Sequence, residues 1–578
     1  MTKAQKSFLG GAAILAGAGL VVKIIGAIFR IPLFNIVGSE GMGIYQFAYP
    51  IYVFLLVAST AGIPVAVSKM VSADISLGKY QNAHKIFTTA MKFLIGLGLV
   101  TSILLFAGSG LISRLQGNEK TLGALQAIAP SLFFVSVISA YRGYFQGMQS
   151  MAPTALSQIV EQLGKLAIGL SLAATWISQG PRYGAIGALI GVTASEVMAL
   201  VLLIGIYMGK RREIMGRVHA SQESGTETSK KILVKIIKIA IPVTIGASVM
   251  SLVAFIDQII VVNRLVPILD QIQGIPYNMD TLIESSKNMG KHISHNLSLA
   301  QAAIQHTDVF AQFKADLATE LYGIMAGACN TLVNFPAFIS LALGMSLVPA
   351  ISKAATVNDR KGVARTASTG VRLTLLLGLP SAVGLIVLAE PIIRVLYGRS
   401  MAEWEALYGG WILSLLAVGV IFLTLIQSMT AILQGAGKVM LPVRNLLIGA
   451  VFKVVITYVL VGTAAWNIRG AAMGTVACYA VAAILDLIGV IRHTGMAFSF
   501  RDIILKPVLA AGIMGLAVWG VRVFGYPLTQ SWGLTLVIAI GAGIVVYAIM
   551  LFAVKAMTKE DMAMVPGLNK LKRFRKGR

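Results

Sequence analysis

The chain has 578 residues, of which 57% are hydrophobic and 12% are charged, and its formal net charge is +25 at neutral pH. A soluble protein carries about 25% charged residues, so this composition excludes a soluble globular protein and predicts an integral membrane protein. In a soluble protein the positive charge would suggest nucleic-acid binding. Lys and Arg are enriched in the cytoplasmic loops of membrane proteins, however, so we expect no nucleic-acid partner. The two cysteines, Cys329 and Cys478, lie in apolar segments and indicate neither a disulfide framework nor a Cys-based metal site.

Apolar segments of about 20 residues, the length that crosses a bilayer as a helix, recur along the chain. The first segment follows basic residues as a signal peptide does, but it is long, contains Lys23 and lacks an obvious cleavage site, so we expect a retained helix. The segments are continuous and do not alternate apolar with polar residues, which excludes a strand barrel. The predicted fold class is an all-α polytopic membrane protein. About fourteen helices are predicted, centred on 8–29, 44–68, 86–111, 122–147, 153–177, 183–208, 236–262, 317–348, 367–395, 404–433, 441–465, 470–491, 503–524 and 532–556.

Basic residues gather in four stretches that all fall on the same side of the membrane as the N-terminus: 69–85, 210–235, 353–365 and 570–578. The positive-inside rule assigns this side to the cytoplasm. We therefore predict a multi-pass protein of the cell membrane with both termini in the cytoplasm. The basic tail is either a plain topology signal, which we favour, or also a contact with anionic lipid headgroups.

The sequence is internally repeated at an offset of roughly 280 to 290 residues. GIPVAVSK, which ends at Lys69, recurs as SLVPAISK, which ends at Lys353, and YFQGMQSMAP, which ends at Pro153, recurs as ILQGAGKVMLP, which ends at Pro442. Equivalent loops lie on the same side, so the repeat is parallel and predicts two pseudo-symmetric six-helix lobes that enclose a central site. The predicted domains are an N-lobe with a basic cytoplasmic loop at 1–235, a C-lobe with an external loop (263–316) at 236–500, an added helix pair at 501–556 and the basic tail at 557–578.

The external loop at 263–316 is the longest polar stretch and holds several acidic residues and histidines. His292 and His295 have i, i+3 spacing, which could place both on one helical face, but no metal-binding or catalytic motif surrounds them. We expect a solvated loop or an amphipathic surface helix there, and no metal, cofactor or catalytic residue.

Ionisable residues within the predicted helices are rare, because a charge inside a membrane is costly unless it is paired or faces water. The cations assigned to substrate binding are Lys23, Arg30, Arg142, Lys165, Arg372 and Lys453. The carboxylates assigned to coupling-ion or counter-ion roles are Glu161, Glu196, Asp257 and Asp486.

Several of these assignments have a structural alternative. The two cations of the first helix could instead extend their long side chains to the membrane interface. Glu161 and Lys165 are four residues apart and could form a purely structural pair on one helix face. Asp257 could form a salt bridge between the lobes. Lys165 and Lys453 occupy nearly matching repeat positions, which favours two cations facing one central cavity.

A central cavity lined by Lys and Arg suits an anionic substrate, because these side chains donate charge-assisted hydrogen bonds to phosphate oxygens. A lipid-linked sugar carries a pyrophosphate that needs such neutralisation, while its lipid tail can stay in the bilayer. No GxxxxGK[ST] motif for ATP follows a strand. We therefore expect the driving force to come from an H⁺ or Na⁺ gradient, the membrane potential or product removal.

Residues 26–69 carry three motifs: GxxxRIPL, GxEGMGIYQFAYPIY and GIPVAVSK. Together these motifs resemble the polysaccharide-transport branch of the MOP exporter superfamily, which includes stage V sporulation protein B and the MurJ-like lipid II flippases. The resemblance runs through the whole chain and is weakest in the loop after Asn263 and in the last two helices. It implies an added helix pair that helps form a groove for a lipid tail.

The functional residues of that family transfer to this chain only in the first helix. MurJ-type flippases have an essential basic pair there, and Lys23 and Arg30 fall near those positions. The second helix has no cation, and the acid–base pair of the family's eighth helix falls on Asn330 and Thr331. Either the cations of this branch lie elsewhere, as at Lys165, or the substrate differs.

The leading hypothesis is a flippase that moves a lipid-linked oligosaccharide pyrophosphate, with the peptidoglycan precursor lipid II as first candidate, from the inner to the outer leaflet. One alternative is another MOP-type carrier, either for capsule-type polysaccharide repeat units or for drugs with cation coupling. A drug exporter for organic cations should have an acidic cavity and lack the added helix pair. A second alternative is a scaffold that recruits cell-wall synthases. A membrane glycosyl transferase or ligase would need a catalytic cluster on the external loop, which shows only scattered candidates, so we expect a transporter and not an enzyme.

Overall fold

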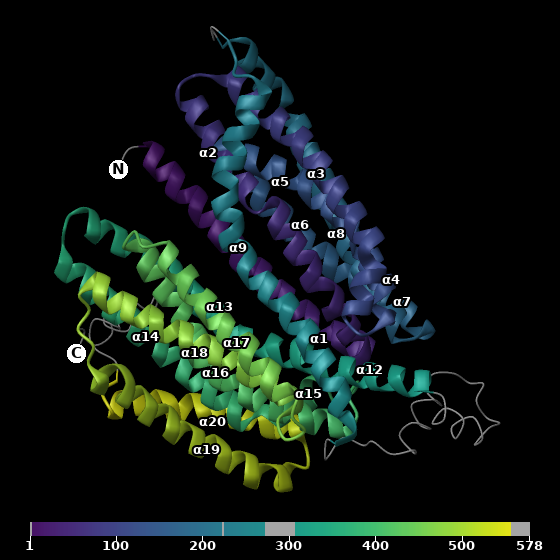
Figure 1. Ribbon diagram of the computed structural model, residues 1–578. Coiled ribbons are helices and arrows are strands. Elements are labelled where there is room, and N and C mark those ends of the chain that lie inside the picture. Colours follow the sequence, from purple (N-terminus) through teal and green to yellow (C-terminus); the bar gives the residue numbers. More distant parts are fainter. Residues whose placement is uncertain (1–2, 222–224, 272–306, 557–578) are drawn as a thin grey trace. The chain divides into compact units, whose positions relative to one another are not determined.

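The computed structural model describes residues 3–221, 225–271 and 307–556, and every regular element within these ranges is a helix (Figure 1). The helices up to the long loop are α1 (Lys3–Thr60), α2 (Gly62–Ser76), α3 (Tyr80–Leu115), α4 (Leu122–Ile128), α5 (Ser131–Gly147), α6 (Ala152–Gly164), α7 (Leu170–Trp176), α8 (Pro181–His219) and α9 (Ser229–Leu265). Those after it are α12 (Thr307–Gly323), α13 (Asn330–Thr356), α14 (Arg360–Val387), α15 (Ala389–Tyr397), α16 (Glu403–Gly435), α17 (Met440–Val461), α18 (Asn467–Thr494), α19 (Lys506–Thr529) and α20 (Trp532–Ala553).

Short 3₁₀ and π segments connect or interrupt these helices. The 3₁₀ segments are η1 (Glu119–Thr121), η3 (Ile177–Gln179) and η4 (Val266–Gln271). The π segments are η2 (Lys165–Gly169), η5 (Ile324–Cys329) and η6 (Arg501–Leu505).

The predicted count of fourteen membrane helices is confirmed within the described ranges. Twelve stretches are long and apolar enough to cross a membrane without interruption. One of them, Gly17–Ser76, holds two predicted spans on either side of a break at Gly38, whose φ of 69° is a value that glycine adopts readily. The fifth predicted span is the series α6, η2 and α7, which the π segment interrupts.

One predicted helix is interrupted in the structure. The ninth segment, predicted as one helix over 367–395, is two helices, because α14 ends at Val387 and α15 begins at Ala389. Pro391 lies in the first turn of α15, where a missing backbone N–H costs nothing.

Within the stretch predicted at 263–316 as a solvated loop or a surface helix, helical structure extends to Gln271 and resumes at Thr307. His292 and His295 lie outside the described residues.

Packing divides the chain into two compact units, Met1–Gly327 and Ala328–Arg578, which are described separately below. The division falls within the eighth span and not after residue 235, because α9 and α12 pack against α1. The predicted lobes at 1–235 and 236–500 are defined by the sequence repeat and not by packing, so they stay predictions.

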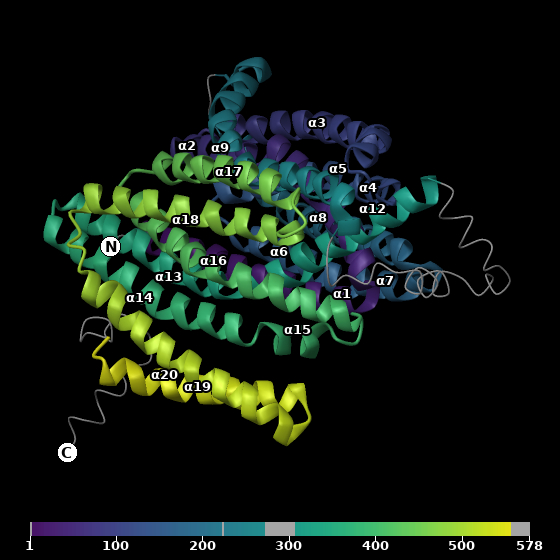
Figure 2. The ribbon, with the colours of Figure 1, turned by 60° about the horizontal axis from the view of Figure 1, so that its bottom comes forward.

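Each unit is held by its own apolar core. In the first unit α2, α3, α5 and α9 share aliphatic contacts, and the rings of Phe87 and Tyr144 stack with centroids 4.3 Å apart. In the second unit α13, α14, α16 and α18 form the core, and the added pair α19 and α20 lies against α14 at its edge (Figure 2).

Candidate functional site

Three predicted site residues of the first unit form one buried ion-pair network. Glu161 in α6 accepts hydrogen bonds from Lys165 Nζ at 2.8 Å and from Arg142 Nη2 of α5 at 3.0 Å. The three side chains are between 8% and 15% exposed. The i, i+4 pairing expected for Glu161 and Lys165 is present, and the structure adds Arg142. Glu196 also lies close enough to act on the charge of Lys165, so two cations and two carboxylates gather here, in an environment that strengthens their electrostatics.

A row of tyrosines on α1 lies beside this network. The rings of Tyr45 and Tyr49 stack with centroids 5.4 Å apart, and those of Tyr49 and Tyr52 follow at 5.8 Å. Tyr49 lies close enough to Lys165 to act on its charge. Sequence reasoning missed these residues, although the i, i+4, i+7 spacing within YQFAYPIY places all three on one helix face.

The other predicted cations are spread over both units. Lys23 is exposed and Arg30 is half-buried on the first part of α1. Arg372 in α14 and Lys453 in α17 are half-buried in the second unit. Because the two units are described separately, a cavity shared by the cations of both stays a prediction.

The other three predicted carboxylates are also buried, and Glu196 lies near the Arg142–Glu161–Lys165 network. Glu196 in α8 is fully buried; its Oε1 accepts the Tyr52 hydroxyl, and its Oε2 has no hydrogen-bond partner among the described residues. Asp486 in α18 accepts a hydrogen bond from Asn445 Nδ2 at 2.8 Å. Asp257 in α9 is 5% exposed. The coupling or counter-ion roles of these carboxylates stay predictions.

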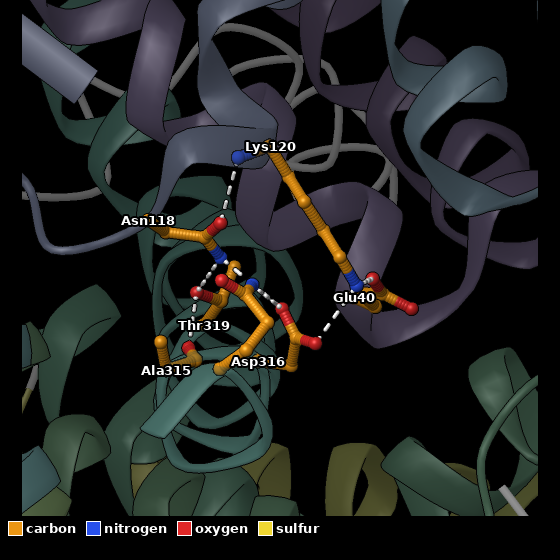
Figure 3. A network of polar contacts seen from close by, with 7 residues as sticks. Glu40, Asn118, Lys120, Ala315, Asp316 and Thr319 are labelled. Atoms are coloured by element: carbon orange, nitrogen blue, oxygen red, sulfur yellow. Dashed lines mark hydrogen bonds and ion pairs between the residues drawn. The ribbon is translucent and has the colours of Figure 1, made fainter. Parts of the chain in front are cut away.

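A second polar network joins three segments that are far apart in the sequence (Figure 3). Lys120 in η1 donates hydrogen bonds to Glu40 Oε1 of α1 at 2.7 Å and to Asp316 Oδ2 of α12 at 2.8 Å. Next to it, Asn118 Nδ2 donates to Thr319 Oγ1 of α12 at 2.8 Å. These five residues are named the α1–α12 seam.

The backbones of α1 and α12 approach closely along this seam. A Cβ atom on Gly43 would lie 2.2 Å from the Thr319 carbonyl oxygen, and one on Gly323 would lie 2.2 Å from the Ser39 carbonyl oxygen. Gln46 Nε2 also donates to a carbonyl of η5 at 2.7 Å. The repeat assigns α1 to the N-lobe and α12 to the C-lobe, so the seam joins segments of the two predicted lobes.

In the second unit, α14, α19 and α20 enclose an apolar groove of about 530 Å³. Its lining runs along α14 from Leu376 to Leu388 and is almost entirely aliphatic. At 1.5 Å per residue this stretch is about 18 Å long, which is more than half the hydrocarbon thickness of a bilayer. Tyr547 of α20 donates its hydroxyl proton to the Leu376 carbonyl at 2.7 Å and fixes one wall of the groove to another.

A charged cluster closes the Leu388 end of the groove. Arg522 of α19 donates Nη1 to the Val387 carbonyl and Nη2 to Glu390 Oε2, both at 2.8 Å. Glu390 Oε1 accepts from Arg394 Nε at 2.9 Å, and Arg394 donates two more hydrogen bonds to Glu403. The cluster ties α19 to α14, α15 and α16 at one end of the membrane-spanning bundle.

Comparison with known proteins shows which families this chain resembles. Residues 8–270 match the family model of polysaccharide biosynthesis proteins, and residues 301–560 match that of the lipid II flippase MurJ. Stage V sporulation protein B of Bacillus subtilis (strain 168) is 26% identical, over 98% of this chain and 99% of its own length. An inward-facing multidrug resistance MATE family transporter of the MOP superfamily has a TM-score of 0.59 at 13% identity, over 82% of this chain and 94% of its own. The chain is thus similar to polysaccharide biosynthesis proteins over its first part and to lipid II flippases over its second, and it shares the fold of a MOP-superfamily transporter.

The resemblance read from residues 26–69 is thereby confirmed. A solved lipid II flippase MurJ in an inward closed conformation matches over 93% of this chain and 98% of its own, with a TM-score of 0.64 at 17% identity. Likeness at this level establishes the MATE- and MurJ-like fold with its added C-terminal pair. The relatives and structural neighbours named here are membrane transport or polysaccharide proteins, in agreement with the expected class.

Proposed function

We propose that this protein is a flippase that moves a lipid-linked oligosaccharide pyrophosphate, with lipid II as first candidate, from the inner to the outer leaflet. The observation that carries the proposal is the apolar groove between α14 and the added pair α19 and α20. A lipid whose head passes through the protein needs a place for its tail, whereas a carrier of water-soluble cargo does not. The length and aliphatic lining of the groove suit one hydrocarbon chain.

The head group would be bound by cations. Arg142 and Lys165 are two buried cations whose side chains donate hydrogen bonds to oxyanions, which supports an anionic cargo, and Glu161 and the nearby Glu196 are their counter-ions. A phosphate could take the place of Glu161 on either cation, because both are hydrogen-bond donors to oxyanions. Lys23 and Arg30 on α1 are proposed to meet the head group as it enters.

Alternating access needs a closure between the lobes that forms and breaks in each cycle. The α1–α12 seam supports this step, because it joins segments that the repeat assigns to different lobes and uses ion pairs in place of a continuous apolar core. The charge pattern assigns this end of the bundle to the outside. A state with the seam closed would therefore receive the head group from the cytoplasmic leaflet.

The energy is proposed to come from an ion gradient or the membrane potential. The potential is worth about 2.3 kcal/mol per charge per 100 mV and favours outward movement of an anionic head group. Among the predicted carboxylates, Glu196 is fully buried, and its Oε2 atom has no hydrogen-bond partner among the described residues. A buried carboxyl group is less costly when it is neutral, which supports H⁺ as a coupling ion.

A second candidate is a flippase for a different polysaccharide repeat unit on the same class of lipid. The match of residues 8–270 to the polysaccharide biosynthesis model favours it. Reconstitution of the full-length protein in vesicles, with either lipid II or another lipid-linked sugar, separates the two candidates by which lipid reaches the opposite leaflet.

The tail groove is tested by filling it. Gly384 lines the groove, and a Cβ there meets no atom within 4 Å, so Gly384→Phe should occupy the groove without a clash. We expect flipping to fall by about tenfold or more, because the tail loses its binding energy. Gly512→Phe is the matched control, since Gly512 is equally open but lies outside the groove. Equal flipping by both variants, or no flipping of any lipid-linked sugar by the wild type, would reject the proposal.

A further inference from the structure

Arg522 lies at the end of the groove, and not all N–H groups of its guanidinium are used in the hydrogen bonds described above. It lies four residues after the groove-lining Val518, so both side chains are on the same face of α19. A guanidinium has five N–H donors, and Arg522 uses one on the Val387 carbonyl and one on Glu390. The side chain is 30% exposed, so its other donors can be reached by a ligand.

The charge of Arg522 is only partly neutralised by its neighbours. Its carboxylate partner, Glu390, is shared, because the other oxygen of Glu390 accepts a hydrogen bond from Arg394. Arg394 has a second carboxylate, Glu403, to itself, with bonds of 2.7 and 2.6 Å. The cluster of two arginines and two glutamates is neutral overall, but Arg394 contacts both carboxylates and Arg522 only one, so Arg522, on the side of the groove, is the less compensated of the two.

Aromatic residues mark the depth of Arg522 in the membrane. The rings of Tyr526 and Trp532 stack with centroids 3.9 Å apart at the turn between α19 and α20, and Arg394 lies 5.4 Å from the Trp532 ring. Trp and Tyr collect at the membrane–water interface. Arg522 lies one helical turn, about 5 Å, before Tyr526, so it sits just below this interface, beside the phosphates of the leaflet. The charge pattern of the loops assigns this end to the outer leaflet.

We propose that Arg522 binds the phosphate of the transported lipid once its head has reached the outer leaflet, while the lipid tail occupies the groove. This inference rests on the proposed flippase function and adds an exit site on helices other than those of the Arg142–Glu161–Lys165 network. A guanidinium matches a phosphate with two parallel N–H···O bonds. Glu390 competes with the phosphate for Arg522, so the bound lipid can be released when the carboxylate returns.

Binding can be measured without any transport, on the full-length protein in nanodiscs of a zwitterionic lipid. The probes are a polyprenyl phosphate and the polyprenyl alcohol of the same chain length, each titrated and followed by quenching of tryptophan fluorescence. We expect the phosphate to bind about tenfold more tightly than the alcohol, and Arg522→Gln to abolish this difference. Lys506→Gln, at the opposite end of α19, is the control and should leave the affinities for the phosphate and for the alcohol unchanged.

Glu390→Gln distinguishes a ligand contact from a structural clamp. The substitution breaks the ion pair as Arg522→Gln does, but it leaves the guanidinium free. A phosphate site predicts binding at least as tight as in the wild type, whereas a clamp predicts the same loss for both variants. The proposal is overturned by that shared loss, by equal affinity for phosphate and alcohol, or by phosphatidylglycerol displacing the probe at equal concentration. Failure of flipping with intact phosphate binding would reject the proposed function and leave this site standing.

Discussion

Removing the charge of Lys120 should open the α1–α12 seam. Its ammonium holds two carboxylates, Glu40 at 2.7 Å and Asp316 at 2.8 Å, and the three side chains are between 15% and 23% exposed. Breaking a fully buried ion pair costs about 3–5 kcal/mol, and an exposed pair is worth about 0–1 kcal/mol. For this intermediate burial we take about 2 kcal/mol, which corresponds to a roughly 30-fold shift in the ratio of closed to open seam.

A cysteine in the seam can report this shift. Thr319 is fully buried beside Asn118, and both native cysteines, Cys329 and Cys478, are buried. In cells carrying Thr319→Cys, a membrane-impermeant maleimide added outside should label the protein about 30-fold faster when Lys120→Met is also present.

Neutralising both carboxylates gives the control for this prediction. Adding Glu40→Gln and Asp316→Asn to Lys120→Met removes the stranded negative charges and should slow labelling again. If Lys120→Met with intact carboxylates labels within about twofold of the protein that keeps Lys120, the reasoning that this ammonium holds the seam is refuted.

Three further outcomes are expected. Gly323→Ala places a Cβ 2.2 Å from a carbonyl oxygen of α1, so it should raise labelling in the same assay even though every charge is intact. Arg522→Gln should lower the free energy of unfolding of the purified protein by about 1–3 kcal/mol. The substitution removes the hydrogen bonds that tie α19 to α14, and it leaves the half-buried Glu390 carboxylate with one partner fewer. Lys506→Gln breaks a more exposed pair on the same helix and should change stability by less than about 1 kcal/mol. Lys165→Gln should reduce flipping about tenfold or more, whereas Arg217→Gln, which removes a 60% exposed cation, should leave it unchanged.

The fold could be predicted because the length of an apolar run alone determines whether it can span a membrane. The break between α14 and α15 was missed because leucine and isoleucine continue across it, so that hydropathy stays high through residue 395. Pro391 was the available signal, since proline is favoured in the first turn of a new helix. The stretch at 263–316 is compatible with a loop and with a surface helix because its apolar and polar residues are mixed, and its two described ends are helical.

The site was predictable only where its contacts are local in sequence. Glu161 and Lys165 pair within one turn, so their spacing was enough. Lys120 and Asp316 are 196 residues apart, and nothing in the sequence indicates that their segments meet. Arg522 was missed for a different reason, because it lies near the end of a helix where a cation is usually explained by snorkelling.

The break at Gly38 has a mechanical consequence for the first helix. The residues on both sides of Gly38 are helical, and only Gly38 itself has a φ of 69°. The segment that carries Lys23 and Arg30 is therefore a separate helix, which the single non-helical residue Gly38 joins to the helix that carries Glu40. Because Phe29, Leu33 and Val37 are buried, the first segment can change its angle at Gly38 only together with the helices that cover it, while Glu40 stays hydrogen-bonded to Lys120.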